Sequence, residues 1–322
     1  MTKIKALLDT INKKILRFVL KLRQISKNIK PIGFFGLSLW DVGYQFYKGV
    51  SQGAIGIRSS AIAFKFFLAI FPAIIFFFTL IPYIPIENFQ ENLMMLIGTI
   101  VPKASFSMIE STIHDIITNK RGSLLSFGVL GSLYFSTSGL ATMIIAFNET
   151  INTFEKRSWI AVRITSIILA LTIFVFATVA IVLITTSETV LGYLVSHNIL
   201  QVGFTYYALI VGKWLIVISF FYFAIAMIYY LAPAKKSGFR FFSPGATLAT
   251  LLGLLLTVGF SYYINNFSSY NKLYGSIGTL IIVLVWLRLN ASIILIGFEL
   301  NASINSLKHN KIFIDSNMKS LK

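Results

Sequence analysis

The chain has 322 residues, of which 56% are hydrophobic and 12% charged, and it contains no cysteine. This composition is far more apolar than that of a soluble domain and predicts an integral membrane protein. The lack of cysteine excludes disulfides, thiolate metal sites and cysteine nucleophiles. A formal net charge of +17 also occurs in nucleic-acid-binding proteins, but the positions of the basic residues indicate a membrane surface, so we expect no nucleic-acid partner.

Residues 1–58 are expected to form a basic amphipathic region ahead of the membrane-spanning part. From Met1 to Lys30, apolar side chains recur at helical spacing on one face, and Lys and Arg fill the other. Such a helix lies in the headgroup plane and is attracted to anionic phospholipid headgroups. A solvated cytoplasmic helix that packs on its own protein is the alternative. The next segment, Ser38 to Ser60, carries aromatic residues suited to the membrane interface.

Six apolar segments follow, and each is about long enough to cross a bilayer as a helix. They are Ala61 to Ile81, Leu124 to Phe147, Ile164 to Thr186, Tyr206 to Leu231, Pro244 to Ile264 and Tyr274 to Glu299. Most of the 28 lysines and arginines lie on the side of the N-terminus, so the positive-inside rule places both termini in the cytoplasm. The expected architecture is all-α, a polytopic six-helix transmembrane domain at 59–304 with a basic cytoplasmic tail at 305–322.

The longest connection, Pro82 to Ser123, is expected on the outer side of the membrane. Apolar residues at helical spacing occur on both sides of Pro102, which predicts two amphipathic helices. We interpret them as helices that pack against the ends of the spans. A lid over a pathway is the alternative interpretation.

Several residues predict bends or close packing between helices. Pro72, in the middle of the first segment, frees a backbone carbonyl and is expected to bend the helix. In the fifth segment, Gly245, Ala249 and Gly253 repeat at intervals of four residues, which lets two backbones approach closely. The small residues that begin the sixth segment, Gly275 among them, are expected to serve the same purpose.

Polar residues within the spans are the candidates for a transport pathway. Arg288 would lie near the middle of the sixth segment, and Glu299 shares its face because the two are about three turns apart. Arg288 either draws an anionic substrate or headgroup into a central cavity or is a structural arginine bonded to neighbouring helices. The hydroxyls of the second segment either line a wet path or bond their own backbone. The pathway candidates are Arg288, Asn290, Glu299, Asn301, Ser136, Ser138 and Glu149.

Catalytic chemistry finds little support in the sequence. The three histidines, His114, His197 and His309, lie in different regions, and none has a neighbouring ligand at metal-site spacing. The carboxylates show no hydrolase arrangement, and there is no Walker A sequence. We therefore expect no metal, no cofactor and no enzymatic activity.

Four stretches resemble the YihY/virulence factor BrkB family. They are AIAFKFFLAIFP in the first span, YYLAP at the end of the fourth, SPGA at the start of the fifth, and LYGSIGTLIIVLVWLRLNASIILIGFELNA in the sixth. The resemblance implies a bacterial inner (plasma) membrane protein with six helices. Pro72, Pro244, Gly245, Tyr274, Gly275, Glu299 and Asn301 match the family pattern, whereas Arg288 and Lys65 depart from it. Members were formerly labelled ribonuclease BN, but the histidine and carboxylate cluster of a metal-dependent nuclease is missing here.

The leading functional hypothesis is a transporter that moves a small or lipidic solute along the second, fifth and sixth helices, with anionic solutes among the candidates. The rival is a non-transporting envelope scaffold that binds lipid or partner proteins. A central solvent-reachable cavity that reaches Arg288 would favour the transporter, and a dry bundle would favour the scaffold. The expected partners are the bilayer and its anionic headgroups, and homo-oligomerisation is left open.

Overall fold

The structure is a computed structural model that describes residues 20–21, 23–83, 94, 115, 119–150, 153–154, 157–201, 203–234, 241–266 and 269–320. Six of its helices are long and apolar enough to cross a membrane. The predicted all-α class and the six spans are therefore confirmed, while the placement of both termini in the cytoplasm stays a prediction. The helix predicted from Met1 to Lys30 is described only at 20–21 and 23–30, where 20–21 and 23–28 are helical, and the two helices predicted between Pro82 and Ser123 fall almost wholly outside the described residues.

The described elements follow one another as helices with a single short strand pair. The helices are α2 (Leu39–Gln52), α3 (Ile55–Leu80, then a 3₁₀ turn, Ile81–Tyr83), α6 (Gly122–Asn148), α7 (Trp159–Ser196), α8 (Phe204–Leu231), α9 (Pro244–Asn266) and α10 (Ser269–Ser320). The strands β1 (Glu149–Thr150) and β2 (Thr153–Phe154) pair antiparallel between α6 and α7. Ser38 begins α2, because its hydroxyl oxygen accepts a hydrogen bond from the Asp41 amide at 3.1 Å.

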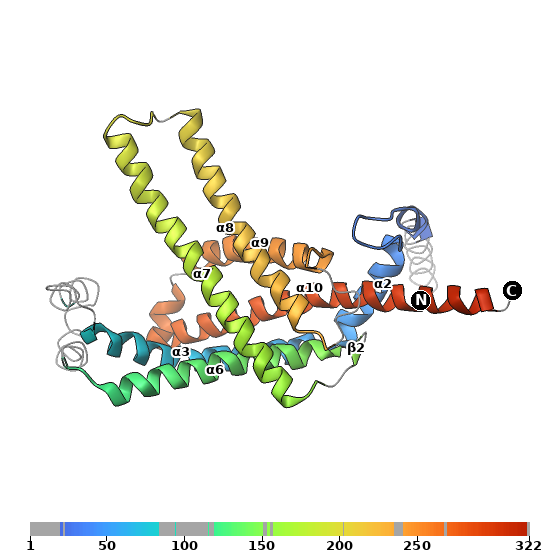
Figure 1. The fold of residues 1–322 in the computed structure, drawn as a ribbon, viewed down its shortest axis with the longest axis horizontal. Helices are drawn as coiled ribbons and strands as arrows, with labels where there is room; N and C mark the ends of the chain where they lie inside the picture. Colours follow the sequence, from blue (N-terminus) through green and yellow to red (C-terminus); the bar gives the residue numbers. More distant parts are fainter. Residues whose placement is uncertain are drawn as a thin grey trace, which may run out of the picture.

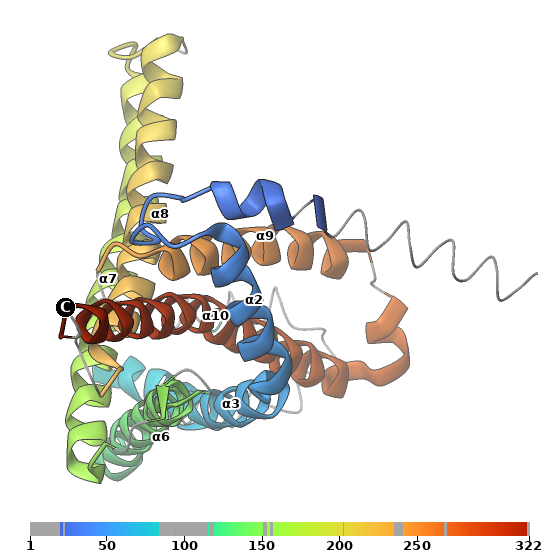
Figure 2. The same ribbon diagram turned by 90° about the vertical axis from the view of Figure 1, so that its right-hand side faces the viewer.

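The spans form three pairs of neighbouring helices, α3 with α6, α7 with α8, and α9 with α10. Figure 1 shows the α7–α8 hairpin rising away from the other two pairs. The pairs are joined by contacts of α6 with α7, α8 with α9, and α10 with α3. Figure 2 shows α2 running beside α10 down to the start of α3. α2 and α10 also pack on one another.

Burial is concentrated at one end of the bundle, which we call the junction end. It comprises α2, the start of α3, the end of α6, the start of α7, the end of α8, the start of α9 and residues 291–305 of α10. Its centre is a trio of buried rings, in which Phe147 stacks on Phe298 with centroids 4.1 Å apart and Tyr229 meets both edge-on at 5.8 Å. Such ring arrangements add to the stabilisation from apolar burial.

The opposite half of the molecule, which we call the far end, is apolar and exposed. Its exposed residues include Phe174, Val182, Tyr207, Trp214, Leu251, Leu255, Val258, Leu280 and Leu284. A helix that exposes apolar side chains all round in a membrane-spanning protein has lipid as its solvent. The far halves of α7 and α8 therefore face lipid rather than a protein core.

Two spans are longer than the hydropathy pattern predicted. The third was expected to end at Thr186, but α7 has 38 residues and ends at Ser196. The sixth was expected to end at Glu299, but α10 has 52 residues and continues to Ser320. Hydropathy marks where strongly apolar sequence stops, whereas a helix can continue beyond that point because no proline interrupts either extension. The expected boundary at 304/305 thus falls inside one unbroken helix.

Candidate functional site

Arg58 links α3 to the end of α6 at the junction end. It lies one turn inside α3, and its Nη1 donates a hydrogen bond of 2.7 Å to the carbonyl oxygen of Ala146. Ala146 belongs to the last turn of α6, where carbonyls lack helical partners and the helix dipole favours a cation. Among the described residues, the buried Nε of Arg58 has no hydrogen-bond partner.

Glu299 places a carboxylate in the same region. It is 1% exposed on α10, and its charge, like that of Glu149 on β1, acts on Arg58. Gly49 of α2 and Gly53, which caps the end of α2, make room for these side chains. A Cβ atom at Gly49 would collide with the Glu299 carboxylate, and one at Gly53 would lie 2.8 Å from an Arg58 nitrogen. Because Gly49 and Gly53 are one turn apart, α2 lies over the guanidinium and the carboxylate.

The end of α8 is held by side chains from outside α8. The Nη1 of Arg157 donates to the carbonyl oxygens of Leu231 at 3.0 Å and Ala232 at 3.2 Å. Partial burial lowers the pKa of the Arg157 guanidinium from its ordinary value, and the group stays charged. Asn148 donates to Ala232 at 3.2 Å and accepts from the Ala234 amide at 2.8 Å. These bonds satisfy backbone groups that the end of a helix leaves unpaired.

Asn301 joins α10 to the start of α9. Its Oδ1 accepts from the Gly245 amide at 2.8 Å, and its Nδ2 donates to the Ser243 hydroxyl at 2.9 Å. Gly245 is the second residue of α9, where amides need a partner from outside the helix. A further bond links α10 to the α7–α8 pair, because the Tyr229 hydroxyl of α8 donates to the carbonyl oxygen of Ile294 on α10 at 2.6 Å.

We call these side chains the junction network. Its members are Arg58, Asn148, Arg157, Tyr229, Ser243, Glu299 and Asn301. They come from α3, α6, α8, α10 and two connecting segments, so the network ties all three helix pairs together. Buried polar groups that find partners fix one arrangement of a core. The network therefore holds the pairs closed at the junction end.

The structure brings two predicted pathway residues, Glu299 and Asn301, into the junction network and places Glu149 beside it. Asn290 instead donates to the carbonyl oxygen of Trp286 in its own helix at 2.9 Å. Ser136 likewise donates to Leu133 at 3.3 Å. Ser138 is buried within α6. Ser132, Thr137 and Thr142 of the same span also donate to carbonyls of their own helix, and a role of Ser136 or Ser138 in a pathway stays a prediction.

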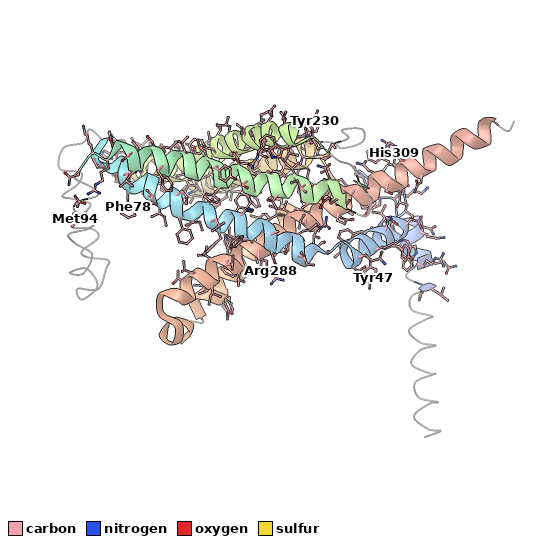
Figure 3. All side chains as sticks on the ribbon, turned by 90° about the horizontal axis from the view of Figure 1, so that it is seen from below. Tyr47, Phe78, Met94, Tyr230, Arg288 and His309 are labelled. Carbon is pink, nitrogen blue, oxygen red and sulfur yellow. The ribbon has the colours of Figure 1, made fainter. Side chains whose placement is uncertain are left out.

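Arg288 lies away from the network. Figure 3 shows it at the crossing of α3 and α10. A Cβ atom at Gly56, the second residue of α3, would lie 3.8 Å from the Arg288 Nη2. The sequence placed this arginine at mid-span, but its guanidinium is level with one end of α3. The difference arises because α10 is longer than a span and crosses α3 obliquely.

The packing predictions concern close helix approaches, and several are visible. A Cβ atom at Gly245 would collide with the carbonyl oxygen of Gly297, so α9 and α10 meet there backbone to backbone. Gly253 faces Phe221 of α8 instead, at 3.1 Å from a Cβ atom built on the glycine. The small residues predicted to form one contact surface on α9 therefore face two different helices, α10 at Gly245 and α8 at Gly253.

The two prolines are also accounted for. Pro72 is buried within α3 and fits against Gly131 of α6, with 2.9 Å between the Pro72 Cβ and a Cβ built at 131. Pro244 begins α9, a position that proline favours, and lies against Gly33. Tyr274 and Gly275 belong to α10, but their surroundings fall outside the described residues.

Sequence analysis missed the rest of the junction network. No local pattern marks Arg58, Asn148 or Arg157 as members of a network. Their positions in the sequence could have indicated this role, because each stands at or near the end of an apolar segment, where the backbone groups of a helix terminus need partners. Gly49 and Gly53 gave a further signal, a small-xxx-small pair at the end of a helix otherwise rich in aromatic residues.

The fold and site define a multi-pass membrane protein whose three helix pairs are closed at one end by a buried polar network. More narrowly, the chain belongs to the virulence factor BrkB family, whose model matches residues 46–317. The family resemblance of the sequence is thereby confirmed, as is a multi-pass protein of the bacterial inner (plasma) membrane. In the part of the chain that the structure describes, no group of three or more His, Asp or Glu side chains is placed to hold a metal ion.

Curated relatives cover most of the chain. A ribonuclease-like protein YfkH of Bacillus subtilis is 30% identical over 82% of this chain and 93% of its own length. A UPF0761 membrane protein of Vibrio campbellii is 26% identical over 81% of each chain. A UPF0761 membrane protein of Haemophilus influenzae is 22% identical over 84% of this chain and 97% of its own. No solved structure matches the chain.

Proposed function

We propose that the protein moves a lipidic solute, with an anionic group, between the membrane and the junction end. The observation that carries the proposal is the contrast between the two ends of the bundle. The junction end is closed by packed rings and the junction network, whereas the far halves of α7 to α10 expose apolar side chains. A lipidic solute can reach such a lipid-facing surface sideways from the bilayer, and rearrangement of the closed junction end would complete its passage by alternating access.

The apolar character of the far end favours a lipidic solute over a hydrophilic one. A hydrophilic solute would have to leave water for surfaces such as Leu251, Leu255 and Val258, which offer no hydrogen bonds. Acyl chains lose nothing by this exchange. The basic residues of the junction end, Arg58 and Arg157, suit an anionic group that arrives there when the network opens.

Opening would require the junction network to exchange its partners. Arg58 and Glu299 lie under α2 at two glycines, so displacement of α2 would uncover a cation and a carboxylate together. Beside the backbone contact of Gly245 with Gly297, the Asn301 bonds to the Gly245 amide and the Ser243 hydroxyl would have to break before α9 moved along α10. The pathway in this proposal lies beside α6, α9 and α10, and Arg288 does not line it.

The test is movement of solute in proteoliposomes that contain the purified full-length protein. Headgroup-labelled and acyl-labelled phosphatidylglycerol and phosphatidylcholine are offered, with a water-soluble fluorescent anion as a further probe. We expect movement of the anionic lipid probe above the rate in protein-free vesicles. Folded protein that moves none of the probes would overturn the proposal and favour the envelope scaffold.

Single cysteines test the gating part of the proposal in this cysteine-free chain. Ser303 is 0% exposed at the junction end, whereas Thr279 is exposed on the far half of α10. With a membrane-impermeant thiol reagent, we expect Cys at 303 to be labelled only while the protein turns over its solute. Permanent protection during measured transport would show that the junction end does not open.

A further inference from the structure

The face of α10 that carries Arg288 belongs neither to the junction network nor to the proposed pathway. Arg288 is exposed, and its guanidinium makes no hydrogen bond or ion pair with any residue that the structure describes. α10 is apolar enough on both sides of it to cross a membrane. An arginine without a partner in such a helix is costly unless something outside the chain neutralises it.

The depth of Arg288 decides what can reach it. Its guanidinium lies beside Gly56, the second residue of α3, and so at one end of that span rather than at its middle. This is the end at which α2 meets the bundle, and Tyr47 of α2 is 70% exposed there. Exposed tyrosines are typical of the layer where headgroups lie. A lipid phosphate is the anion present at that depth.

The same face of α10 continues from Arg288 toward the far end as apolar surface. Ile281 and Val285 precede Arg288 by about two turns and one turn, so the three side chains share a face, and all three are exposed. Their spacing along the axis, about 10 Å from Ile281 to Arg288, is shorter than one acyl chain. The cation at headgroup depth matches the phosphate of a phospholipid, and the apolar residues that precede it on the same face match an acyl chain.

We propose that this face of α10 binds one acidic phospholipid, with its phosphate on Arg288 and an acyl chain along Val285 and Ile281. A guanidinium holds a phosphate through paired hydrogen bonds. The site carries one positive charge without a carboxylate partner, so a headgroup of net charge minus one fits it better than a zwitterion. The bound lipid is a resident of the protein surface, and its binding does not depend on the transport proposed above.

The test is native mass spectrometry of the detergent-purified full chain, titrated with phosphatidylglycerol or phosphatidylcholine. The wild type is expected to bind phosphatidylglycerol more tightly. Arg288→Gln is expected to weaken that binding about tenfold and to remove the preference over phosphatidylcholine. Arg288→Lys, which keeps the charge but not the paired donors, should fall between them.

Arg163→Gln is the matched control. Arg163 is also an arginine at the junction end, but its guanidinium already lies over the rings of Tyr134 and Trp159, at 5.5 and 5.6 Å from their centroids. We expect its loss to leave the preference for phosphatidylglycerol in place. Ile281→Gln tests the acyl part, because an uncharged polar side chain on the apolar part of this face, about two turns from Arg288, should weaken lipid binding while the guanidinium stays unpaired. This variant also decides the question if Arg288→Gln fails to fold.

Three results would overturn the assignment. An unchanged lipid preference in Arg288→Gln would show that the lipid binds elsewhere. Competition by glycerol phosphate as strong as that by the whole lipid would show a site for free anions. A shift between monomer and dimer in Arg288→Gln, with lipid binding unchanged, would show that a second copy of the chain covers this face. None of these results bears on movement of solute in proteoliposomes, so the two proposals fail separately.

Discussion

The two ends of the bundle are built from similar apolar helices but use their glycines differently. At the junction end, side chains or backbone of other helices occupy the space beside Gly49, Gly53, Gly245 and Gly297. In the far halves of α7, α8 and α9, Gly192, Gly212 and Gly259 have nothing within 4 Å of the position that a Cβ atom would take, whereas Gly128 of α6 still meets the Phe76 backbone of α3. Hydrophobicity alone therefore does not distinguish the helices that pack from those that face lipid; small residues and polar partners do.

Replacement of one junction glycine should have the largest effect. In Gly245→Leu the new side chain would meet the Gly297 carbonyl and lie within 2.6 Å of the Asn301 Cγ at its first carbon. Backbone would have to move, which costs about 3 kcal/mol of stability. We expect loss of the folded protein, measured by thermal unfolding in detergent. Gly259→Leu in the same helix should leave the unfolding temperature unchanged, and equal damage by both would erase the distinction between the ends.

Removal of a buried charge should rank second. Glu299→Ala leaves Arg58 in a partly buried site with Glu149 still acting on it, so we expect a cost of about 2 kcal/mol, below that of breaking a fully buried pair. The far-end control is Glu188→Ala, which breaks a 3.5 Å ion pair with Lys213 in which the glutamate is 68% exposed. Lys213 is itself only 9% exposed but keeps the ring of Trp214, at 5.5 Å from its centroid, so we expect a loss of about 1 kcal/mol. Denaturant unfolding of both variants should show the difference, and a mild Glu299→Ala would mean that Arg58 is satisfied without it.

A buried amide that joins two helices should matter more than one that serves its own helix. Asn301→Ala leaves the Gly245 amide and the Ser243 hydroxyl without their partner, at a cost of about 1–3 kcal/mol. Asn290→Ala removes only a bond to Trp286 in α10, so we expect no more than about 0.5 kcal/mol. Comparable losses in thermal unfolding would contradict the assignment of Asn301 to the network.

The smallest predicted effect concerns one hydroxyl. Tyr229→Phe keeps the stacked rings but removes the bond to the Ile294 carbonyl, which should cost about 1 kcal/mol. Tyr207 on the far half of the same helix is exposed, and Tyr207→Phe should be neutral. Hydrogen exchange at the amides of residues 291–298 should rise only in Tyr229→Phe. No change there would show that the hydroxyl does not hold α10.

The spans and the family followed from the sequence because both depend on local pattern. Apolar segments such as Tyr206 to Leu231 can be identified from their length and hydropathy. The observed α8 begins only two residues earlier and ends at the same residue. The junction network did not follow, because its bonds join residues as distant as Arg58 and Ala146. Arg288 was the most conspicuous residue in the sequence, yet its depth depends on how obliquely α10 crosses α3, which no local pattern encodes.

The continuity of α10 makes most of it a rigid lever. A helix of 52 residues is about 78 Å long at 1.5 Å per residue, and the junction end grips it at residues 291–305. The part from Ser306 to Ser320 reaches about 22 Å beyond that grip, and Figure 1 shows it projecting from the bundle. Figures 1 and 2 show the first turns of α10 bending away from the rest, so only the part beyond that bend acts as a rod, in which a sideways force on one end displaces the other. A soluble partner that binds residues 306–320 would thereby move the part of α10 that precedes residue 291 without entering the bilayer.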